Sequence, residues 1–380
     1  SGVQYSGKWN LQTQGQAVGA GTWTGIPTTE LWIWGNGAQG QLGQSDQVSR
    51  SSPVQIGALT DWSAIASGPY HSLAVKTNFT LWAWGYNGNG ATGAVPTYSS
   101  PVQVGALTNW LKVAGGTYFS LAAKTDGTLW AFGKGAKGQL GNGSTANQFS
   151  PVQIGSLTTW SKVAAGQNHS LALKTDGTLY AWGGNARGQL GDGTTVDKSS
   201  PVQVGALTTW LSISAGIYSC MALKTDGTLW GWGSNDQGQL GDGTVIGRSS
   251  PIQVGALTTW SKIGTGHYAH YAVKTDGTLW AWGNSYYGQL GQGNTTSYSS
   301  PVQVGSLTTW SAVSGGAAHA LGTTTGGTLY AWGSNSGGQL GDGTTVSKSS
   351  PVQVGSLTTW GVLATSSGSD FSFVTIAGTT

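Results

Sequence analysis

Residues 151–183 read PVQIGSLTTWSKVAAGQNHSLALKTDGTLYAWG. Four short runs in this stretch, PVQIG, WSKVAAG, HSLALKT and TLYAWG, have the length and composition of β-strands. Asp176 and Gly177 stand between the last two runs, and this dipeptide tolerates the positive φ of a tight hairpin turn. We therefore expect one unit of four short strands, with no helix.

The same stretch returns along the chain at a nearly constant spacing. Its opening Pro recurs after 48 residues and then five times after 50 residues, and a Trp follows nine residues after each copy. The copies of this Pro are Pro53, Pro101, Pro151, Pro201, Pro251, Pro301 and Pro351. A period near 50 residues built from strands predicts the blades of a β-propeller rather than a helical solenoid.

The two ends of the repeat region are incomplete in complementary ways. TELWIWG at 29–35 matches a fourth strand with no third strand before it, and FSFVTIAG at 371–378 matches a third strand with no fourth strand after it. Pairing them would close the ring and leave no exposed strand edge between its ends. We predict an all-β fold, a seven-bladed β-propeller with four-stranded blades, closed by pairing strand 29–35 with strand 371–378.

The repeats define two segments of the chain. We expect a single propeller over residues 29–380 and an N-terminal leader over residues 1–28. All of the 20 Trp except Trp9 and Trp23 occupy positions that recur from copy to copy, which indicates packing. Trp9 and Trp23 have no place in the repeat, so we predict that they dock the leader onto the propeller or onto a neighbouring subunit.

Composition excludes several classes of protein. Of the 380 residues only 8% are charged, against about 25% in a typical soluble domain. No run approaches the ~18 apolar residues of a membrane span, and the 20 Trp and 13 Tyr are too many for a disordered chain. A net charge of +3 is too small to imply a nucleic acid or an anionic membrane as partner. The single Cys220 excludes an internal disulfide framework.

The acidic residues do not form a catalytic set. Asp176 and its equivalents belong to hairpin turns, and Asp192 belongs to a GDGT turn in which Asn142 or Gln44 stands in other copies. Such exchanges keep turn chemistry but would remove a general base. His267 and His270 lie close together but have no third metal ligand nearby in the sequence. We therefore expect no enzymatic activity, no cofactor and no metal site.

NHSLALKTDGTLYAWGGNARGQLGDGTTVDKSSPVQVG at 168–205 and its six relatives resemble the regulator of chromosome condensation repeats. The resemblance covers residues 29–380 and implies a seven-bladed propeller, in agreement with the count of copies. The second copy departs from the pattern, with GATG in place of GQLG at 90–93, and in the sixth the turn reads TTGG at 324–327, where other copies have KTDG. Residues 1–28 also resemble leaders found ahead of such repeats in phage structural proteins.

Histidine recurs at the start of the third strand in three copies. His71, His169 and His319 occupy this position, where other copies have Phe119, Ser219, Ala269 and Phe371. In the exchange factor of the resembled family, the equivalent His lies on the face that binds the small GTPase Ran. The resemblance therefore implies partner contacts for these three residues, while the departures in four copies favour a structural role.

The copies differ most in the loops that follow the fourth strand and in the residues just before the third. Loops on a rigid scaffold often carry binding, and Tyr offers large contact area at low entropic cost. We therefore select as candidate contacts to a partner or a glycan Tyr70, Tyr118, Tyr218, Tyr268, Tyr286 and Tyr287. Drift of solvent-exposed loops is an equally good interpretation of their variation.

Three functions are compatible with these observations. The first is a structural or adhesive propeller of a phage virion, such as a tail fibre or surface decoration, whose loops bind a host glycan or neighbouring proteins. It would be found on a virion or an extracellular surface, with no signal peptide in this chain. The second, by family analogy, is a guanine-nucleotide exchange factor or regulator of a GTPase. The third is a protein inhibitor that binds through one face of the propeller.

Overall fold

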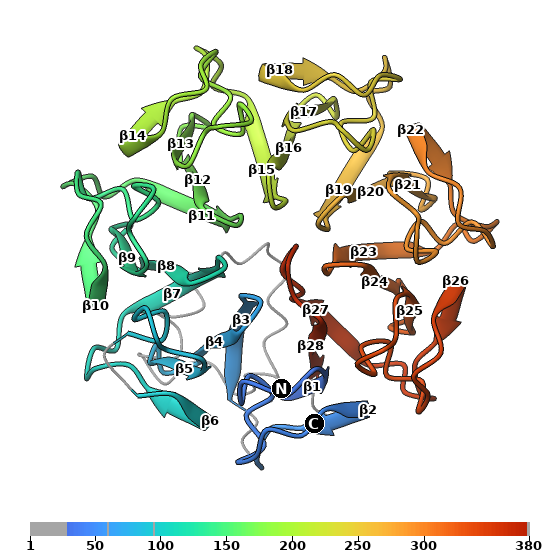
Figure 1. Ribbon diagram of the computed structural model, residues 1–380, viewed down its shortest axis with the longest axis horizontal. Coiled ribbons are helices and arrows are strands. Elements are labelled where there is room, and N and C mark those ends of the chain that lie inside the picture. The colour runs from blue at the N-terminus through green and yellow to red at the C-terminus, as the bar shows by residue number, and fades with distance from the viewer. Residues whose placement is uncertain (1–28, 59–60, 94–95, 378–380) are drawn as a thin grey trace, which may run out of the picture.

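The computed structural model describes residues 29–58, 61–93 and 96–377. Over these residues the chain forms 28 strands in seven four-stranded antiparallel sheets, which stand as blades around a central axis (Figure 1). This arrangement confirms the predicted all-β, seven-bladed propeller. The described part of the chain contains no helix with the length and apolar character of a membrane span.

Each blade is built from an inner, a second, a third and an outer strand. The inner strands are β3 (Trp62–Ser67), β7 (Trp110–Gly115), β11 (Trp160–Ala165), β15 (Trp210–Ala215), β19 (Trp260–Thr265), β23 (Trp310–Gly315) and β27 (Trp360–Leu363). The second strands are β4 (His71–Lys76), β8 (Phe119–Lys124), β12 (His169–Lys174), β16 (Ser219–Lys224), β20 (Ala269–Lys274), β24 (His319–Thr324) and β28 (Phe371–Ala377).

Two further strands complete each sheet towards the rim of the disc. The third strands are β1 (Thr29–Gly35), β5 (Leu81–Gly85), β9 (Leu129–Gly133), β13 (Leu179–Gly183), β17 (Leu229–Gly233), β21 (Leu279–Gly283) and β25 (Leu329–Gly333). The outer strands are β2 (Arg50–Gln55), β6 (Tyr98–Gln103), β10 (Gln148–Gln153), β14 (Lys198–Gln203), β18 (Arg248–Gln253), β22 (Tyr298–Gln303) and β26 (Lys348–Gln353).

The boundary between blades differs from the unit expected from the sequence. The PVQ segment at Pro151 does not begin its own blade, because β10 pairs with β9 and forms the outer edge of the preceding sheet. A blade therefore begins at the Trp of its inner strand. Pro lacks the N–H that a central strand must donate, so an edge strand is the place in a sheet where it is tolerated.

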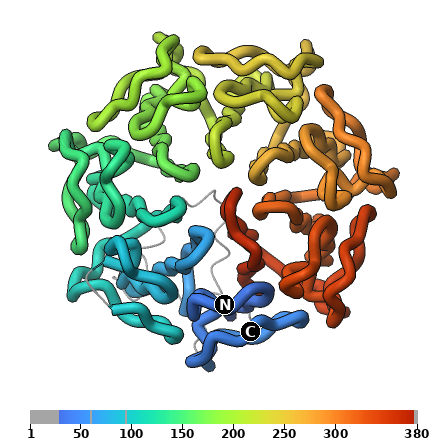
Figure 2. Tube along the Cα trace, in the orientation of Figure 1, coloured from blue at the N-terminus to red at the C-terminus, as the bar shows by residue number. Residues whose placement is uncertain are grey.

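The ring closes by pairing the two ends of the repeat region. β1 and β28 pair antiparallel over their full length, from Thr29 opposite Ala377 to Gly35 opposite Phe371. The closing blade thus takes its two inner strands from the C-terminal end and its two outer strands from the N-terminal end, where blue meets red in Figure 2. The predicted pairing of 29–35 with 371–378 is confirmed for the described residues.

Six tryptophans, each directly before the last Gly of a third strand, fasten six of the seven blades to the blade before; on β9, Phe132 stands at this position. These side chains are fully buried, and each indole Nε1 donates to the main-chain carbonyl of a Gln in the preceding blade at 2.8 or 2.9 Å. The pairs are Trp34–Gln339, Trp84–Gln41, Trp182–Gln139, Trp232–Gln189, Trp282–Gln239 and Trp332–Gln289. The prediction that these Trp are core residues is confirmed.

Because neighbouring strands run in opposite directions, the connections fall on two faces of the disc. The loop face carries the short links from inner to second strand, such as 166–168, and the long loops before the outer strand, such as 184–197. The turn face carries the hairpins, such as 175–178, and the links between blades, such as 204–209. The variable residues singled out from the sequence belong to the loop face.

Candidate binding face

A cluster of three tyrosines spans two adjacent blades on the loop face. The rings of Tyr70 and Tyr118 are stacked, with centroids 5.3 Å apart and an angle of 18° between their planes. Tyr86, which directly follows β5, meets both rings edge-on, with centroid distances of 6.4 Å to Tyr70 and 5.8 Å to Tyr118. We call these residues the tyrosine cluster; each ring is held by the other two before any partner arrives.

The repeat explains why two of these rings meet. Tyr70 and Tyr118 occupy the same position in successive blades, just before the second strand, so the ring geometry places them side by side. Lys134, which follows β9, lies with its Nζ 5.5 Å from the ring centroid of Tyr118. Burial, followed by the proximity of Tyr70, raises the pKa of Tyr118 above its usual value. The Tyr118 phenol therefore remains a hydrogen-bond donor beside a positive charge.

A second aromatic group lies on the loop face of the blade formed by β19–β22. Tyr286 and Tyr287 are 72% and 48% exposed, and their rings meet edge-on at 4.9 Å. Their backbone N–H groups donate to the side-chain oxygens of Asn284 and Gln289, at 3.0 and 2.8 Å. In the same blade the His267 ring stacks on Tyr268 at 3.8 Å. The loop is thus fixed while its two aromatic side chains face solvent.

The structure divides the six candidate tyrosines rather than gathering them in one site. Tyr70 and Tyr118 are brought together, and Tyr268, Tyr286 and Tyr287 share one blade. Tyr218 is half-buried on the loop face and makes no ring contact with another aromatic side chain of the described residues. Sequence comparison did not select Tyr86, although this residue begins the loop after the fourth strand of its copy, where the copies differ most.

The three candidate histidines cannot contact a partner, so that interpretation is corrected. His71, His169 and His319 are fully buried between blades. Each Nε2 lies within hydrogen-bonding distance of the following blade, 2.9 Å from Ser120 Oγ, 3.1 Å from Cys220 Sγ and 3.0 Å from Ser372 Oγ, respectively. Burial lowers the pKa of His71 and His169 to about 4 and that of His319 to about 3. All three are neutral structural groups at pH 7.

The serines decide which ring nitrogen carries the proton. Ser120 Oγ donates its hydrogen to the carbonyl of Ala91 at 2.7 Å, and Ser372 Oγ donates to the carbonyl of Gln339 at 2.8 Å. A hydroxyl has a single hydrogen to donate, so Nε2–H of His71 and of His319 must be the donor in each pair. The described residues leave Nδ1 of these rings without a partner.

His270 belongs to the same set, although the sequence presented it as a weak metal ligand beside His267. His270 is fully buried, and its Nε2 lies 3.0 Å from Ser219 Oγ of the preceding blade. Ser219 occupies the same repeat position as His169, and His270 occupies the same repeat position as Cys220, the residue that His169 contacts. The His and the small polar residue are therefore exchanged between the two blades. Among the described residues no three His, Cys, Asp or Glu side chains are grouped to hold a metal.

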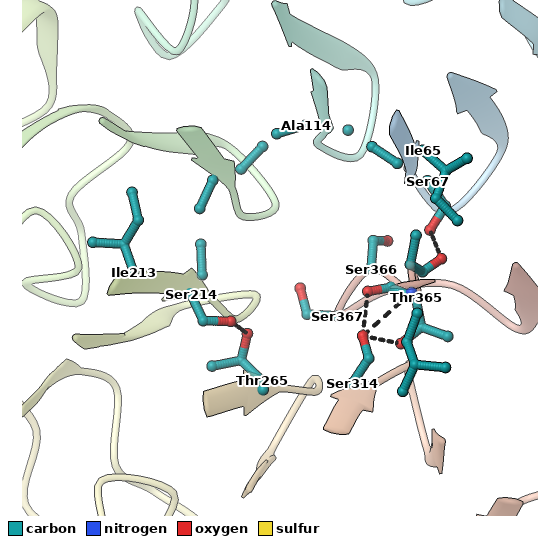
Figure 3. A pocket seen from close by; sticks show the side chains of 18 of the residues that line it. Ile65, Ser67, Ala114, Ile213, Ser214, Thr265, Ser314, Thr365, Ser366 and Ser367 are labelled. Carbon is teal, nitrogen blue, oxygen red and sulfur yellow. Dashed lines mark hydrogen bonds between the residues drawn. The ribbon is translucent and has the colours of Figure 1, made fainter. Parts of the chain in front are cut away.

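A central channel runs between the inner strands. It contains a cavity of about 250 Å³ lined in part by the hydroxyl groups of Ser67, Ser214, Thr265 and Ser314. Figure 3 shows Ser366 and Ser367 of the closing blade reaching into this cavity. Beside them, the Thr365 hydroxyl donates to Ser314 Oγ on β23.

The link from β27 to β28 closes the loop-face end of this channel. A Cβ placed on Gly368 would lie 2.8 Å from Pro69 Cγ and 3.7 Å from Ile217 Cδ1, although Pro69 and Ile217 belong to different blades. The segment 366–368 therefore crosses the mouth of the channel.

These observations define a closed propeller that presents a set of aromatic loops on one face of a rigid disc. The chain belongs to the RCC1-like domain family, whose model matches residues 30–374. No curated protein sequence matches the chain. The family assignment agrees with the resemblance drawn from residues 168–205.

Three solved structures share the whole fold. Human WBSCR16 is 22% identical and superposes with a TM-score of 0.82, covering 93% of this chain and 100% of that one. Yeast RCC1 (Prp20), solved bound to Kap60, is 19% identical with a TM-score of 0.83, covering 100% and 95%. Prp20p of Saccharomyces cerevisiae, in a report that also describes its binding to Gsp1p and histones, is 20% identical with a TM-score of 0.81, covering 99% and 97%.

Two expectations from the sequence remain predictions. Trp9, Trp23 and the leader over residues 1–28 lie outside the described residues. Neither the family nor these solved structures supports a place on a virion, so that role stays a prediction.

Proposed function

We propose that this chain is a non-enzymatic propeller that binds a protein partner on its loop face, as a regulator or exchange factor of a small GTPase. The tyrosine cluster carries the proposal. Tyr is enriched in protein interfaces, and stacked rings lose little further freedom when a partner binds. Lys134 beside Tyr118 adds a positive charge that suits an acidic patch on the partner.

Family membership favours a GTPase over other protein partners. Prp20p, which shares the fold, is described together with Gsp1p and histones, and yeast RCC1 with Kap60. The buried histidines contribute to this function only indirectly, because they hold adjacent blades in register beneath the loop face. The contacts themselves would come from the tyrosine cluster and the loops around it.

The test is nucleotide release from a panel of small GTPases loaded with a fluorescent GDP analogue. We expect one member to release nucleotide at least tenfold faster with this chain, and Tyr70→Ala to remove most of the acceleration. Tyr98→Ala is the matched control, since Tyr98 is 39% exposed against 37% for Tyr70 but lies on an outer strand. Absence of both binding and release across the panel, or equal losses in the two variants, would refute the proposal.

A second candidate function, adhesion to a glycan, is favoured by Tyr286 and Tyr287. Two adjacent, solvent-facing rings on a fixed loop form a surface on which a sugar ring can stack. This function would fit a structural or surface protein, including the virion component expected from the sequence. Binding on a glycan array that is lost in Tyr286→Ala and Tyr287→Ala, but kept in Tyr70→Ala, would establish it in place of the GTPase.

A further inference from the structure

Three lysines occupy one repeat position at the turn-face end of the central channel. Lys112, Lys162 and Lys262 each lie two residues after the Trp that begins an inner strand, on β7, β11 and β19. The inner strands run from the turn face, where their Trp stands, to the loop face. The other four blades have uncharged residues at this position, namely Ala64, Ser212, Ala312 and Val362. No acidic residue is therefore present in this ring of side chains.

Two of these lysines stand beside the channel, and Lys112 occupies the equivalent position on β7. Lys162 and Lys262 line a cavity of about 300 Å³ together with Ile263 and Val313. Ile263 and Val313 also line the central cavity, so the two spaces adjoin. Lys162 Nζ donates to the main-chain carbonyl of Leu211 in the next blade at 2.6 Å, which holds this ammonium group between β11 and β15.

The positive charges of the three lysines are not neutralised by the described residues. The ion pairs of the described residues involve other lysines and arginines. Burial lowers the pKa of Lys112, and burial together with the charges of Lys112 and Lys262 lowers the pKa of Lys162. The charges of Lys112 and Lys262 act on Lys162, and an anion bound beside Lys162 and Lys262 would offset this repulsion.

The channel behind the lysines limits what can bind. Residues 366–368 cross its loop-face end, and we take the turn face, where the lysines stand, as the entry for a ligand. The two cavities, of about 250 and 300 Å³, lie at or below the small end of the range for small-molecule sites. A folded protein or a duplex cannot enter them. Hydroxyl groups such as Ser214 and Thr265 line the inner cavity and could hydrogen-bond to a polar ligand.

We propose that the turn-face mouth of the central channel is a binding site for a small polyvalent oxyanion of the phosphate type. Lys112, Lys162 and Lys262 supply the charge, since ammonium groups bind phosphate oxygens as point charges. The site is separate from the tyrosine cluster, because it opens on the opposite face of the disc.

The probe is inorganic pyrophosphate, measured by isothermal titration calorimetry in a low-salt buffer free of phosphate and sulfate. We expect binding that weakens as salt is added, at least a tenfold loss in Lys162→Gln and in Lys112→Gln, and retention in Lys162→Arg. Lys137→Gln is the control, since Lys137 is 56% exposed, lies on the loop face and pairs with Asp197. Unchanged unfolding temperatures would show that the variants remain folded.

Several results would overturn the proposal. These are no heat of binding at millimolar pyrophosphate, equal losses in Lys137→Gln and Lys162→Gln, or binding of an acidic peptide but not of pyrophosphate. Tyr70→Ala should bind pyrophosphate like the unaltered chain. A chain that does not bind pyrophosphate could therefore still act on a small GTPase. A chain without effect on any GTPase could still bind pyrophosphate at this site.

Discussion

His71 and Phe119 fill the same repeat position in neighbouring blades, and both are fully buried. Phe119 needs no hydrogen-bond partner, and Ser170 of the following blade then simply donates to the carbonyl of Gln139 at 2.8 Å. His71 adds a bond to Ser120 at 2.9 Å. The position therefore accepts a buried aromatic ring with or without a polar partner, and in other blades it is filled by the small residues Ser219 and Ala269.

Burial of neutral histidines makes the stability of this chain depend on pH. The pKa of His71 falls from 6.5 to about 4 on folding. Between these values the unfolded chain binds a proton that the folded chain does not, so the free energy of unfolding falls as the pH decreases from 6.5 towards 4. Each such His contributes about 1.4 kcal/mol per pH unit within that window.

We predict that His71→Phe folds and loses part of this pH dependence. The slope of the unfolding free energy between pH 6 and 5 should decrease by about 1.4 kcal/mol per pH unit, measured by urea unfolding. Phe119→Leu, at the same repeat position but without an ionisable group, should keep the slope of the unaltered chain. An unchanged slope in His71→Phe would show that this His titrates normally in the folded state.

Sequence reasoning favoured a structural role for these histidines but could not name their partners, which lie in the next blade, 49 residues away for His71 and 51 for His169. The exchange of Ser219 and His270 was a usable signal, since it keeps one His and one small polar residue across the same interface. The charge at the channel mouth was equally hidden. Lys112, Lys162 and Lys262 share one repeat position in the sequence, but only the closed ring arranges their inner strands around one channel.

At the scale of the element, the GQLG turn fits closely against the next blade. Gly141, at the end of this turn after β9, has a positive φ of 73°. A Cβ at this position would lie 2.6 Å from Nε1 of Trp182, the indole that donates to Gln139. Gly155 also has a positive φ, of 61°, but a Cβ there would meet nothing within 4 Å.

The two glycines give a controlled comparison of backbone strain and steric clash. Gly155→Ala should cost only the backbone penalty, about 1–2 kcal/mol. Gly141→Ala should cost about 1–3 kcal/mol more, because Trp182 must move and its hydrogen bond to Gln139 is disturbed. Urea unfolding of both variants measures the difference. Equal destabilisation would mean that the interface between blades adapts to an extra methyl group.

The one wrong prediction about the fold, the blade to which each outer strand belongs, also concerns single elements. Strand lengths, turn types and the closing pair were predictable, because Asp-Gly turns mark four of the copies and a Trp recurs at the same position in all seven. The assignment of each outer strand was wrong, since β10 adjoins β9 rather than β11. Spacing alone gives a period but not the residue at which a unit begins. The Pro in each outer strand was the physical clue, because it requires an edge.

At the scale of the whole molecule, the disc is closed by strand pairing between the two ends of the repeat region, without a hairpin turn. In the closing blade Leu31 faces Thr375, in the same register in which Leu179 faces Leu173 in an ordinary blade. In that ordinary blade the second and third strands are joined by the TDGT turn at 175–178. The closing blade therefore has the geometry of a hairpin whose turn is missing.

We predict that a permuted chain with this turn restored will fold. Ile376 would be joined to Leu31 through Thr-Asp-Gly-Thr, and new ends would be opened in the loop-face segment 184–197. The permuted chain should unfold cooperatively, as judged by circular dichroism. Truncation before Phe371 should instead abolish the cooperative transition, because β1 loses its partner. A permuted chain that aggregates, or a truncated chain that unfolds cooperatively, would contradict this account of closure.

The register of β1 and β28 has a mechanical consequence. Thr29 and Ala377 lie opposite each other at one end of the pair, so a force pulling the two chain ends apart acts on the terminal bonds first. The strands would then unzip one pair at a time instead of shearing all their bonds together. Under tension, the seam that seals the disc is the place where it opens, and the remaining blades would follow from both sides.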